Sequence, residues 1–301
     1  MMNTNISYST SNGAMYHCSC EKFLRDYKDK NLSPVNLIFT SPPFPLNRAK
    51  KYGNMTGEEY IAWLEELAVL FSSVLADDGS IVMEIGNAWE SGVPVQSTLP
   101  IEALLAFKKA GKFKLCQEFI HYNPARLPSP VEWVNKRRER VKDSFTHIWW
   151  MSKSDHPKAS NKNVLLPYSK QMEKLIKTGK YNAGKRPSEH TIGTESFSKN
   201  NGGAIPSNVI IASNTVSNDP YLKYCKENNL EIHPARMPKE LPDFFIRFLT
   251  DEADLVLDPF GGSNMTGFTA EMLNRKWISI EAEQKYIAGS IGRFSDDVLT
   301  R

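Results

Sequence analysis

A short polar and aromatic segment, Thr40–Phe44 (Thr-Ser-Pro-Pro-Phe), carries residue types that could do chemistry. It follows the apolar run Val35–Phe39, which the sequence predicts to be a buried strand. The two prolines have no N–H to donate to a sheet, so the loop is stiff and its carbonyl oxygens are held in place. The hydroxyl of Ser41, these carbonyls and the flat ring of Phe44 suit a planar ring that carries an amino group. Considered alone, the segment is also typical of a proline turn that only ends a strand.

A second candidate site is the glycine-rich segment Asp258–Asn264 (Asp-Pro-Phe-Gly-Gly-Ser-Asn). It follows a predicted strand, Leu255–Leu257, and precedes a predicted helix, Met265–Leu273. The next predicted strand, Trp277–Ile280, ends at Glu281. In nucleoside-binding sheets, a carboxylate about 20 residues after such a turn accepts hydrogen bonds from ribose hydroxyls. A purely structural turn would explain the glycines, but the two carboxylates favour a cofactor site.

The acidic start of this turn narrows the choice of ligand. The segment does not match Gly-x-Gly-x-x-Gly, and Asp258 would repel a pyrophosphate but suit an ammonium group. The ligand should therefore have a ribose and a positive end, and no phosphates. S-adenosylmethionine fits this description, whereas NAD and ATP do not. The residues expected to bind it here are Asp258, Phe260, Gly261, Gly262, Ser263, Asn264 and Glu281.

The elements that must position these two segments alternate along the chain. Further predicted strands are 80–85, 113–122 and 145–151. Residues 15–29 are predicted to be a short apolar start followed by a helix, and further predicted helices are 100–110, 242–249 and one that begins at Thr56 and is ended by Asp78-Gly79. Such alternation predicts an α/β fold with a mostly parallel sheet covered by helices. Ligands bind at the carboxyl ends of strands in these sheets, so both candidate sites should lie along one edge.

The composition is that of a globular protein. The chain has 301 residues, of which 41% are apolar and 24% charged, with a net charge of +3. No apolar run approaches the roughly 20 residues that span a membrane, and the first residues lack the apolar core of a signal peptide. The four cysteines include no Cys-x-x-Cys pair. We expect a soluble cytoplasmic protein without a zinc site, whose contacts with any polyanion depend on local clusters of charge.

Two basic regions could form such clusters. The polar segment 152–232 interrupts the alternation, and between Lys153 and Asn200 it carries ten basic and four acidic residues, with Lys185 and Arg186 adjacent. It is either a solvated insertion or a surface for a polyanion. The densest basic run, Lys136–Lys142, follows Trp133. It could be a solvated helix face, but its place between two predicted strands favours phosphate contacts through Lys136, Arg137, Arg138 and Arg140.

The two motifs together resemble those of the bacterial DNA amino-methyltransferases. That family carries (Ser/Asp/Asn)-Pro-Pro-(Tyr/Phe) at its catalytic loop and an Asp-Pro-Phe-x-Gly-Ser-type loop for S-adenosylmethionine. The catalytic motif comes first here, with a variable region between the two, which resembles the circularly permuted β group. Serine at the first catalytic position resembles the N4-cytosine enzymes, whereas Asp or Asn is more usual for N6-adenine. The resemblance covers nearly the whole chain.

The resemblance implies a domain division and roles for single residues. Residues 1–151 would form the catalytic half of a Rossmann-like methyltransferase domain, 152–232 a target-recognition insertion, and 233–301 the cofactor-binding half. The implied catalytic residues are Ser41, Pro42, Pro43 and Phe44, and His233, Pro234 and Arg236 would lie at the methionine end of the cofactor. Many relatives have Gly-Asp where this chain has Cys18-Ser19, so Ser19 would bind the adenosine without a carboxylate.

The expected reaction is transfer of a methyl group to the N4 amine of a cytosine flipped out of a short duplex site. Acceptors at Ser41 and Pro42 would pull on the amine hydrogens while Phe44 stacks on the ring. Arg126, just after a predicted strand, would lie near the flipped base, although a rigid strand-end loop explains it equally well. The 5-methylcytosine route needs a cysteine nucleophile, typically in a Pro-Cys loop, and no cysteine here follows a proline.

Three alternatives remain open from the sequence. The same fold could act on N6 of adenine, or on another planar amine such as protein glutamine, or it could be an inactive DNA-binding relative. The expected partners are double-stranded DNA and a cognate restriction endonuclease that acts on the same site. The expected source is bacterial or phage.

Overall fold

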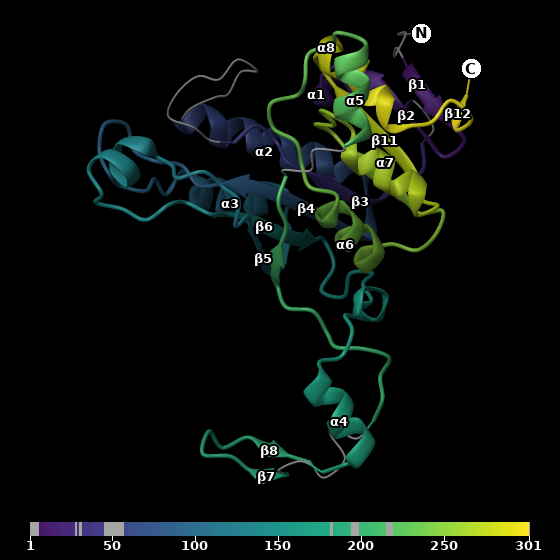
Figure 1. The fold of residues 1–301 in the computed structure, drawn as a ribbon. Coiled ribbons are helices and arrows are strands. Elements are labelled where there is room, and N and C mark those ends of the chain that lie inside the picture. The colour runs from purple at the N-terminus through teal and green to yellow at the C-terminus, as the bar shows by residue number, and fades with distance from the viewer. Residues whose placement is uncertain are drawn as a thin grey trace. The chain divides into compact units, whose positions relative to one another are not determined.

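The computed structural model describes residues 6–27, 29, 32–44, 57–180, 183–193, 199–214 and 219–300. The chain divides into a larger unit, formed by Met1–Ala159 and Asn208–Arg301, and a smaller unit, Ser160–Ser207. The larger unit contains both candidate sites, so the fold that matters for chemistry is the fold of this unit (Figure 1).

One sheet organises the described part of the larger unit. Its strand order is β12-β1-β2-β11-β10-β3-β4-β6-β5-β9. The strands are β1 (Ile6–Thr10), β2 (Gly13–His17), β3 (Val35–Thr40), β4 (Leu75–Gly86), β5 (Lys114–Tyr122), β6 (Phe145–Ser152), β9 (Val209–Ile211), β10 (Leu255–Asp258), β11 (Lys276–Glu281) and β12 (Leu299–Thr300). The run from β2 to β4 is parallel, and β6 is antiparallel to both of its neighbours. The predicted α/β class with a mostly parallel sheet is confirmed.

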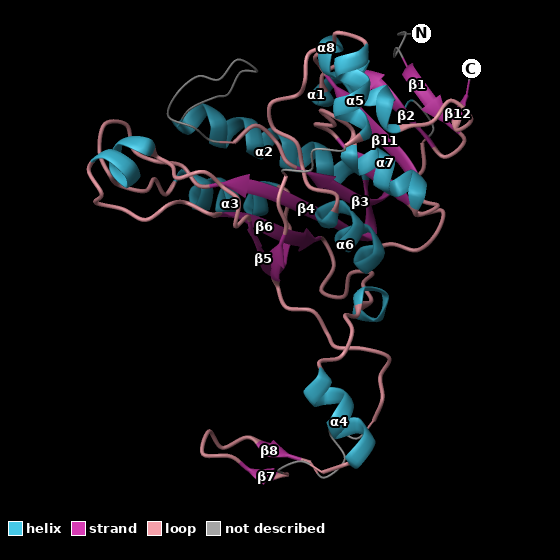
Figure 2. Ribbon diagram, viewed as in Figure 1, coloured by secondary structure: helices cyan, strands magenta, loops and turns pink. Residues whose placement is uncertain are grey.

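Helices cover both faces of this sheet (Figures 1 and 2). One face carries α1 (Cys20–Arg25), α2 (Gly57–Val74) and α3 (Leu99–Ala110). The other carries α6 (Glu240–Leu249), α7 (Met265–Met272) and α8 (Gln284–Ser290). The helix α5 (Pro220–Glu227) contacts α8 and the short helix η4 (Ile291–Arg293). Among the described residues, no helix is both long enough and apolar enough to cross a lipid bilayer.

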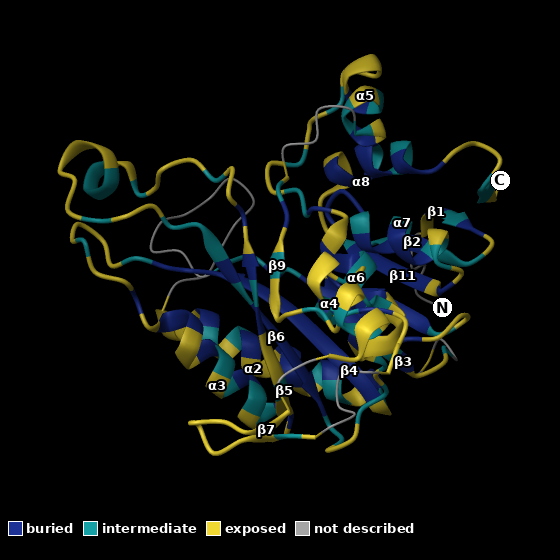
Figure 3. Cartoon of the chain, turned by 60° about the horizontal axis from the view of Figure 1, so that its bottom comes forward, coloured by how far each residue is buried: buried dark blue, intermediate teal, exposed yellow. Residues whose placement is uncertain are grey.

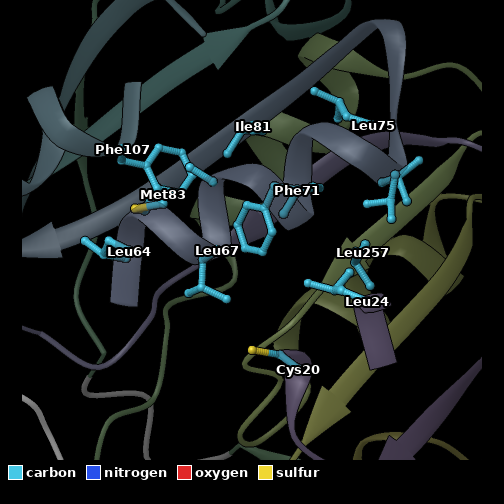
Figure 4. Packing of buried hydrophobic residues seen from close by; sticks show 14 of the residues in the cluster. Cys20, Leu24, Leu64, Leu67, Phe71, Leu75, Ile81, Met83, Phe107 and Leu257 are labelled. Atoms are coloured by element: carbon cyan, nitrogen blue, oxygen red, sulfur yellow. The ribbon is translucent and has the colours of Figure 1, made fainter. Parts of the chain in front are cut away.

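The alternation of side chains along β4 shows how the core is divided. Ile81 and Met83 point into one apolar cluster, where they pack with Phe71 of α2 and Phe107 of α3 (Figure 4). Val82 points to the opposite face and joins the cluster beneath α6. Successive side chains of a strand alternate between faces, so β4 is buried on both. Each fully buried side chain of this size stabilises the fold by roughly 1.5–3 kcal/mol.

The predicted elements differ from the observed ones at their ends, and the sequence analysis did not predict β1, β9, β12, α5 or α8. The helix predicted from Thr56 to Asp78-Gly79 is α2, which ends earlier, at Val74, because β4 begins at Leu75; its predicted first residue, Thr56, lies outside the described residues. The segment predicted to be an apolar start and a helix before residue 29 divides into β2 and α1, where the side chain of Ser19 caps the helix by accepting from the backbone N–H of Lys22.

The smaller unit is shorter than the predicted insertion 152–232. It contains η3 (Asn161–Val164), α4 (Lys170–Thr178), β7 (Gly184–Lys185) and β8 (Thr191–Ile192). None of these elements has a buried residue, and Figure 3 colours β7 as exposed. The sequence analysis assigned β9 and α5 to the insertion, but β9 pairs with β5 and α5 contacts α8, so these two segments belong to the larger unit.

Candidate functional site

The two sequence motifs meet in one open cavity of about 810 Å³. The parallel strands β3 and β10 are neighbours, so their carboxyl ends bring Ser41–Phe44 and the turn Asp258–Ser263 together. A cavity of this size suits a small molecule together with part of a second one. Every predicted site residue that lines the cavity belongs to the larger unit.

Asp258 connects the two motifs through hydrogen bonds to residues of both. Its Oδ1 accepts from the hydroxyl of Thr40 at 3.0 Å and from the backbone N–H of Phe260 at 3.1 Å, and its Oδ2 accepts from the hydroxyl of Thr266 at 2.6 Å. The side chain is buried, and burial raises its pKa from 3.8 to about 6 despite these hydrogen bonds. Asp258 therefore fixes the turn as well as facing the cavity, a role beyond the predicted attraction of an ammonium group.

The glycine turn and Glu281 hold each other in place. Gly262 has a φ of +51°, a left-handed conformation that favours glycine, and its N–H donates to Oε2 of Glu281 at 2.9 Å. Oε1 of Glu281 accepts from the backbone N–H of Glu283 at 2.9 Å. Burial raises the pKa of Glu281, and these backbone donors act in the opposite direction. A carboxylate so oriented at the cavity wall retains lone pairs that can accept from ribose hydroxyls.

Asn264 does not line the cavity, although the sequence placed it among the ligand-binding residues. It is fully buried, where its Oδ1 accepts from the N–H of Gly267 and from the hydroxyl of Ser279, and its amide donates to Tyr8. It caps α7 from a left-handed backbone conformation, so its role is structural. The hydroxyl of Ser263 lies at the cavity but accepts from the buried guanidinium of Arg293 at 3.0 Å.

The segment His233–Arg236 lies on the cavity wall, as the resemblance implied. The ring of His233 packs edge-on against Tyr286 with the ring centroids 4.4 Å apart, and a Cβ at Gly262 would lie 3.2 Å from its Nε2. Burial lowers the pKa of His233, which favours the neutral ring. Pro234 also lines the cavity, and the guanidinium of Arg236 lies 3.6 Å from Asp219.

A carboxylate that the sequence analysis missed stands close to Ser19. Ser19 and Glu21 both line the cavity, and Glu21 accepts from the indole N–H of Trp63 at 2.8 Å. Burial alone would raise the pKa of Glu21, but the bond from Trp63 and nearby donors more than offset this, and its pKa is lowered. The cavity wall therefore has an acidic side chain two residues beyond the position where many relatives carry Asp. The signal was present as Glu21 at the start of a predicted helix.

Phe44 lies over the end of β4. If Gly86 carried a Cβ, that atom would lie 2.6 Å from Cδ2 of the Phe44 ring. Non-bonded atoms do not approach a Cβ so closely in folded proteins. The Phe44 ring can therefore occupy this position only because residue 86 is a glycine without a side chain. Phe44, Ser41, Pro42 and Pro43 all line the cavity, with Pro42 buried and the others partly accessible.

A buried glutamate and histidine complete the base-facing side of the cavity and were not predicted. Glu84 lies on β4 and His121 on β5, with Oε1 of Glu84 2.9 Å from Nδ1 of His121. The hydroxyl of Thr146 donates to the same carboxylate oxygen at 2.7 Å. Nε2 of His121 lies 3.2 Å from the carbonyl oxygen of Ala212, so both ring nitrogens face oxygen atoms.

The pairing of β3 with β4 brings this carboxylate to the catalytic loop. Thr40 is opposite Met83 in the parallel register, so the next residues along each strand, Ser41 and Glu84, are neighbours across the pair. A lone acidic residue within the predicted strand 80–85 was the sequence signal for this group.

The side chains predicted to contact DNA differ in the contacts that they make within the protein. Arg126 lines the cavity and donates to the carbonyl of Phe145 at 3.0 Å. Lys136 and Arg137 pair with Glu132, within and just after the short helix η2 (Glu132–Lys136). The predicted contact of Arg140 with phosphate does not match its position: its guanidinium stacks 3.4 Å from the centroid of Trp89, and its Nη1 is buried without a hydrogen-bond partner.

Two basic residues belong to the smaller unit. Lys185 pairs with Thr191 in the β7–β8 hairpin, and the N–H of Arg186 donates to the carbonyl of His190 at 2.8 Å. Both residues are exposed. Within the described ranges, no group of three or more His, Cys, Asp or Glu residues is arranged to hold a metal ion.

Comparison with known proteins gives consistent results. A family model described as DNA methylase matches residues 35–291. The type II methyltransferase M.PvuII of Proteus hauseri is 46% identical over 296 residues, which cover 98% of this chain and 87% of that protein. A solved structure titled PvuII DNA methyltransferase (cytosine-N4-specific) superposes with a TM-score of 0.78 at 38% identity, covering 99% and 91% of the two chains. A structure of M1.HpyAVI in complex with SAM has the same fold, with a TM-score of 0.55 at 19% identity and coverage of 93% and 98%.

Proposed function

The chain belongs to the DNA methylase family, and from this premise we propose that it methylates N4 of a cytosine at a specific site in duplex DNA. The observation that carries the proposal is the meeting of Ser41–Phe44 and the turn Asp258–Ser263 in one cavity. The similarity over nearly the full chain to a protein described as cytosine-N4-specific supports cytosine rather than adenine.

S-adenosylmethionine is the methyl donor, and the residues present fit it. Glu281 offers carboxylate lone pairs at one wall of the cavity, and the turn at Gly262 leaves room that a Cβ would fill. Glu21 offers a second carboxylate near Ser19. When bound, the cofactor supplies a methyl group activated by a sulfonium centre.

The chain's own residues prepare the amine. The N4 nitrogen of cytosine is a poor nucleophile because its lone pair is delocalised into the ring. The hydroxyl of Ser41 and the carbonyl of Pro42 accept its hydrogens and favour a pyramidal nitrogen, while Phe44 stacks on the ring. After methyl transfer the nitrogen loses a proton. Glu84, which is adjacent to Ser41 across the strand pair, is placed to receive it.

The DNA is bound mainly through basic side chains of two segments. Arg137, Arg138 and Lys136 of the larger unit and Lys185 and Arg186 of the smaller unit are exposed and can approach phosphates. We assign target recognition to the smaller unit and its flanking segments.

A cognate endonuclease that cuts the same site is the partner suggested by the type II name of the relative, and bacterial cytoplasm is where such an enzyme meets its DNA.

Nucleoside analysis tests the proposal. Plasmid DNA from cells that express the protein is digested to nucleosides and analysed by mass spectrometry, with Ser41→Ala as the matched control. We expect N4-methylcytosine from the wild type and much less from the variant, because one positioned acceptor is lost. N6-methyladenine as the only product would overturn the cytosine assignment and leave the family assignment in place.

A further inference from the structure

Leu127 is an exposed apolar side chain at the mouth of the cavity. It lines the cavity, yet 80% of its surface is accessible. It follows Arg126 on the loop that leaves β5, and prolines occupy positions 124, 128 and 130. The high solvent exposure of a large apolar side chain at the rim of a binding site needs an explanation, because exposure of apolar surface to water is unfavourable.

The loop that carries Leu127 is held in place on both sides. The N–H of Asn123 donates to the carbonyl of Ser144 at 2.8 Å, and the N–H of Asp143 donates to the carbonyl of Ser129 at 3.1 Å. The ammonium of Lys142 donates to the carbonyls of Pro124 and Arg126 at 3.0 and 3.3 Å.

The guanidinium of Arg126 adds a further bond, to the carbonyl of Phe145 at 3.0 Å. These contacts use the backbone carbonyls and the charged side chains of the loop. They leave the side chain of Leu127 with no part in fixing the loop, and they present it on a rigid support.

We propose that Leu127 enters the DNA stack beside the flipped cytosine. The inference rests on the proposed function, since it assumes a duplex substrate whose target base leaves the helix to reach Ser41. Removal of a base from the stack opens a gap, and apolar side chains on DNA-bending proteins fill such gaps between base steps. Among the described residues, Leu127 is the large apolar side chain that is both exposed and in the cavity lining, so it lies where that gap forms when the base occupies the cavity.

A neighbouring residue supplies the control. Val141 is 87% exposed and lies in the basic run of the same region, but it does not line the cavity. Replacement of Val141 by Ala removes exposed apolar surface of similar kind without changing the rim. Leu127→Met serves as the conservative variant, because it keeps a long apolar side chain.

The test compares two duplexes that carry the methylated site found by nucleoside analysis. In one the target base is paired normally, and in the other it is opposite an abasic position, so extrusion costs less. We expect Leu127→Ala to methylate the paired duplex about tenfold more slowly and to approach the wild-type rate on the abasic duplex. Leu127→Met and Val141→Ala should match the wild type on both.

Two results would overturn the role of Leu127. One is an equal loss by Leu127→Ala on both duplexes, which would make it a general contact. The other is no loss on either. The proposed function is judged separately, by which base the wild type methylates. If that base is adenine, the test of Leu127 is repeated with two duplexes that carry adenine as the target base, and the expected results for the variants are the same.

Discussion

The hydroxyl of Thr40 donates to Oδ1 of Asp258 across 3.0 Å, and this bond joins the residue before Ser41 to the first residue of the glycine turn. The two residues are 218 positions apart in the chain. Both are buried, so the bond is shielded from water. It follows that the position of the base-binding loop and the position of the cofactor turn are coupled through a single carboxylate.

The raised pKa of Asp258 predicts a dependence of stability on pH. Between the ordinary value of 3.8 and about 6, the folded chain binds a proton that the unfolded chain does not. The free energy of unfolding should therefore fall as the pH rises through this interval. Asp258→Asn removes the contribution, so relative to the wild type its stability should improve from pH 4 to pH 7 by up to roughly 3 kcal/mol. Urea denaturation at both pH values measures the difference.

Glu281 should be needed for cofactor affinity. Glu281→Ala removes the acceptor for the N–H groups of Gly262 and Glu283 as well as for ribose hydroxyls. Each lost charge-assisted bond is worth about 1.5–3 kcal/mol, so binding of S-adenosylmethionine should weaken at least tenfold. Isothermal calorimetry on the folded variant checks this, with exposed Glu252→Ala as the control. Unchanged affinity would exclude Glu281 from the cofactor site.

Gly86 should control the position of the Phe44 ring. In Gly86→Ala the new methyl group would occupy space now held by Cδ2 and Cε2 of Phe44. The ring must move, so turnover should fall at least tenfold, since misplacement of a binding group by about 1 Å carries such costs. The affinity for the cofactor should not change, because the cofactor turn at Gly261 follows β10, whereas Gly86 is the last residue of β4. Full turnover by a folded Gly86→Ala enzyme would show that Phe44 need not lie over β4.

Two Glu–His pairs in the described part of the chain allow a chemical role to be distinguished from a structural one. Glu84 pairs with His121 and lines the cavity, whereas Glu118 pairs with His147 at 2.8 Å and does not. Glu84→Gln should lower kcat by a factor of about 10² or more, because a general base is lost, and leave cofactor binding intact. Glu118→Gln should lower kcat little. Equal effects of the two substitutions would assign Glu84 to structure only.

The arginines of the basic run should fall into two classes. Arg138 is exposed at a positive φ of 58°, and Arg138→Ala should weaken DNA binding at every sequence and lower the slope of log affinity against log salt by about 1. Arg140 stacks on Trp89 and has a buried Nη1. Arg140→Ala should change the slope little and make the loop easier to cleave by trypsin. Gel shifts over a salt series and limited proteolysis distinguish the two, and a full unit of slope lost in Arg140→Ala would contradict the division.

The two motifs and the strands β3, β4, β5, β6, β10 and β11 were predictable because each rests on a local pattern, whereas β1, β9 and β12 were not predicted. Val35–Phe39 is apolar and bounded by prolines, and the turn after Asp258 combines glycines with an acidic residue. The contacts of Asn264 with Tyr8 and of Arg140 with Trp89 could not be foreseen, because these partners are distant in the chain. The Glu84–His121 pair was missed for the same reason, since only the order of β4, β6 and β5 brings the two together.

The alternation of side chains along β4 also determines which changes to this strand would preserve both the core and the cavity. Ile81 and Met83 pack into the core, and Glu84, one position on, faces the cavity. Insertion or deletion of one residue between them would turn the carboxylate inward and an apolar side chain toward the DNA base. A change in the length of this strand between the end of α2 and Gly86 would therefore disturb the packing of the core and the cavity together, whereas a substitution at a single position would not change which face the other side chains occupy.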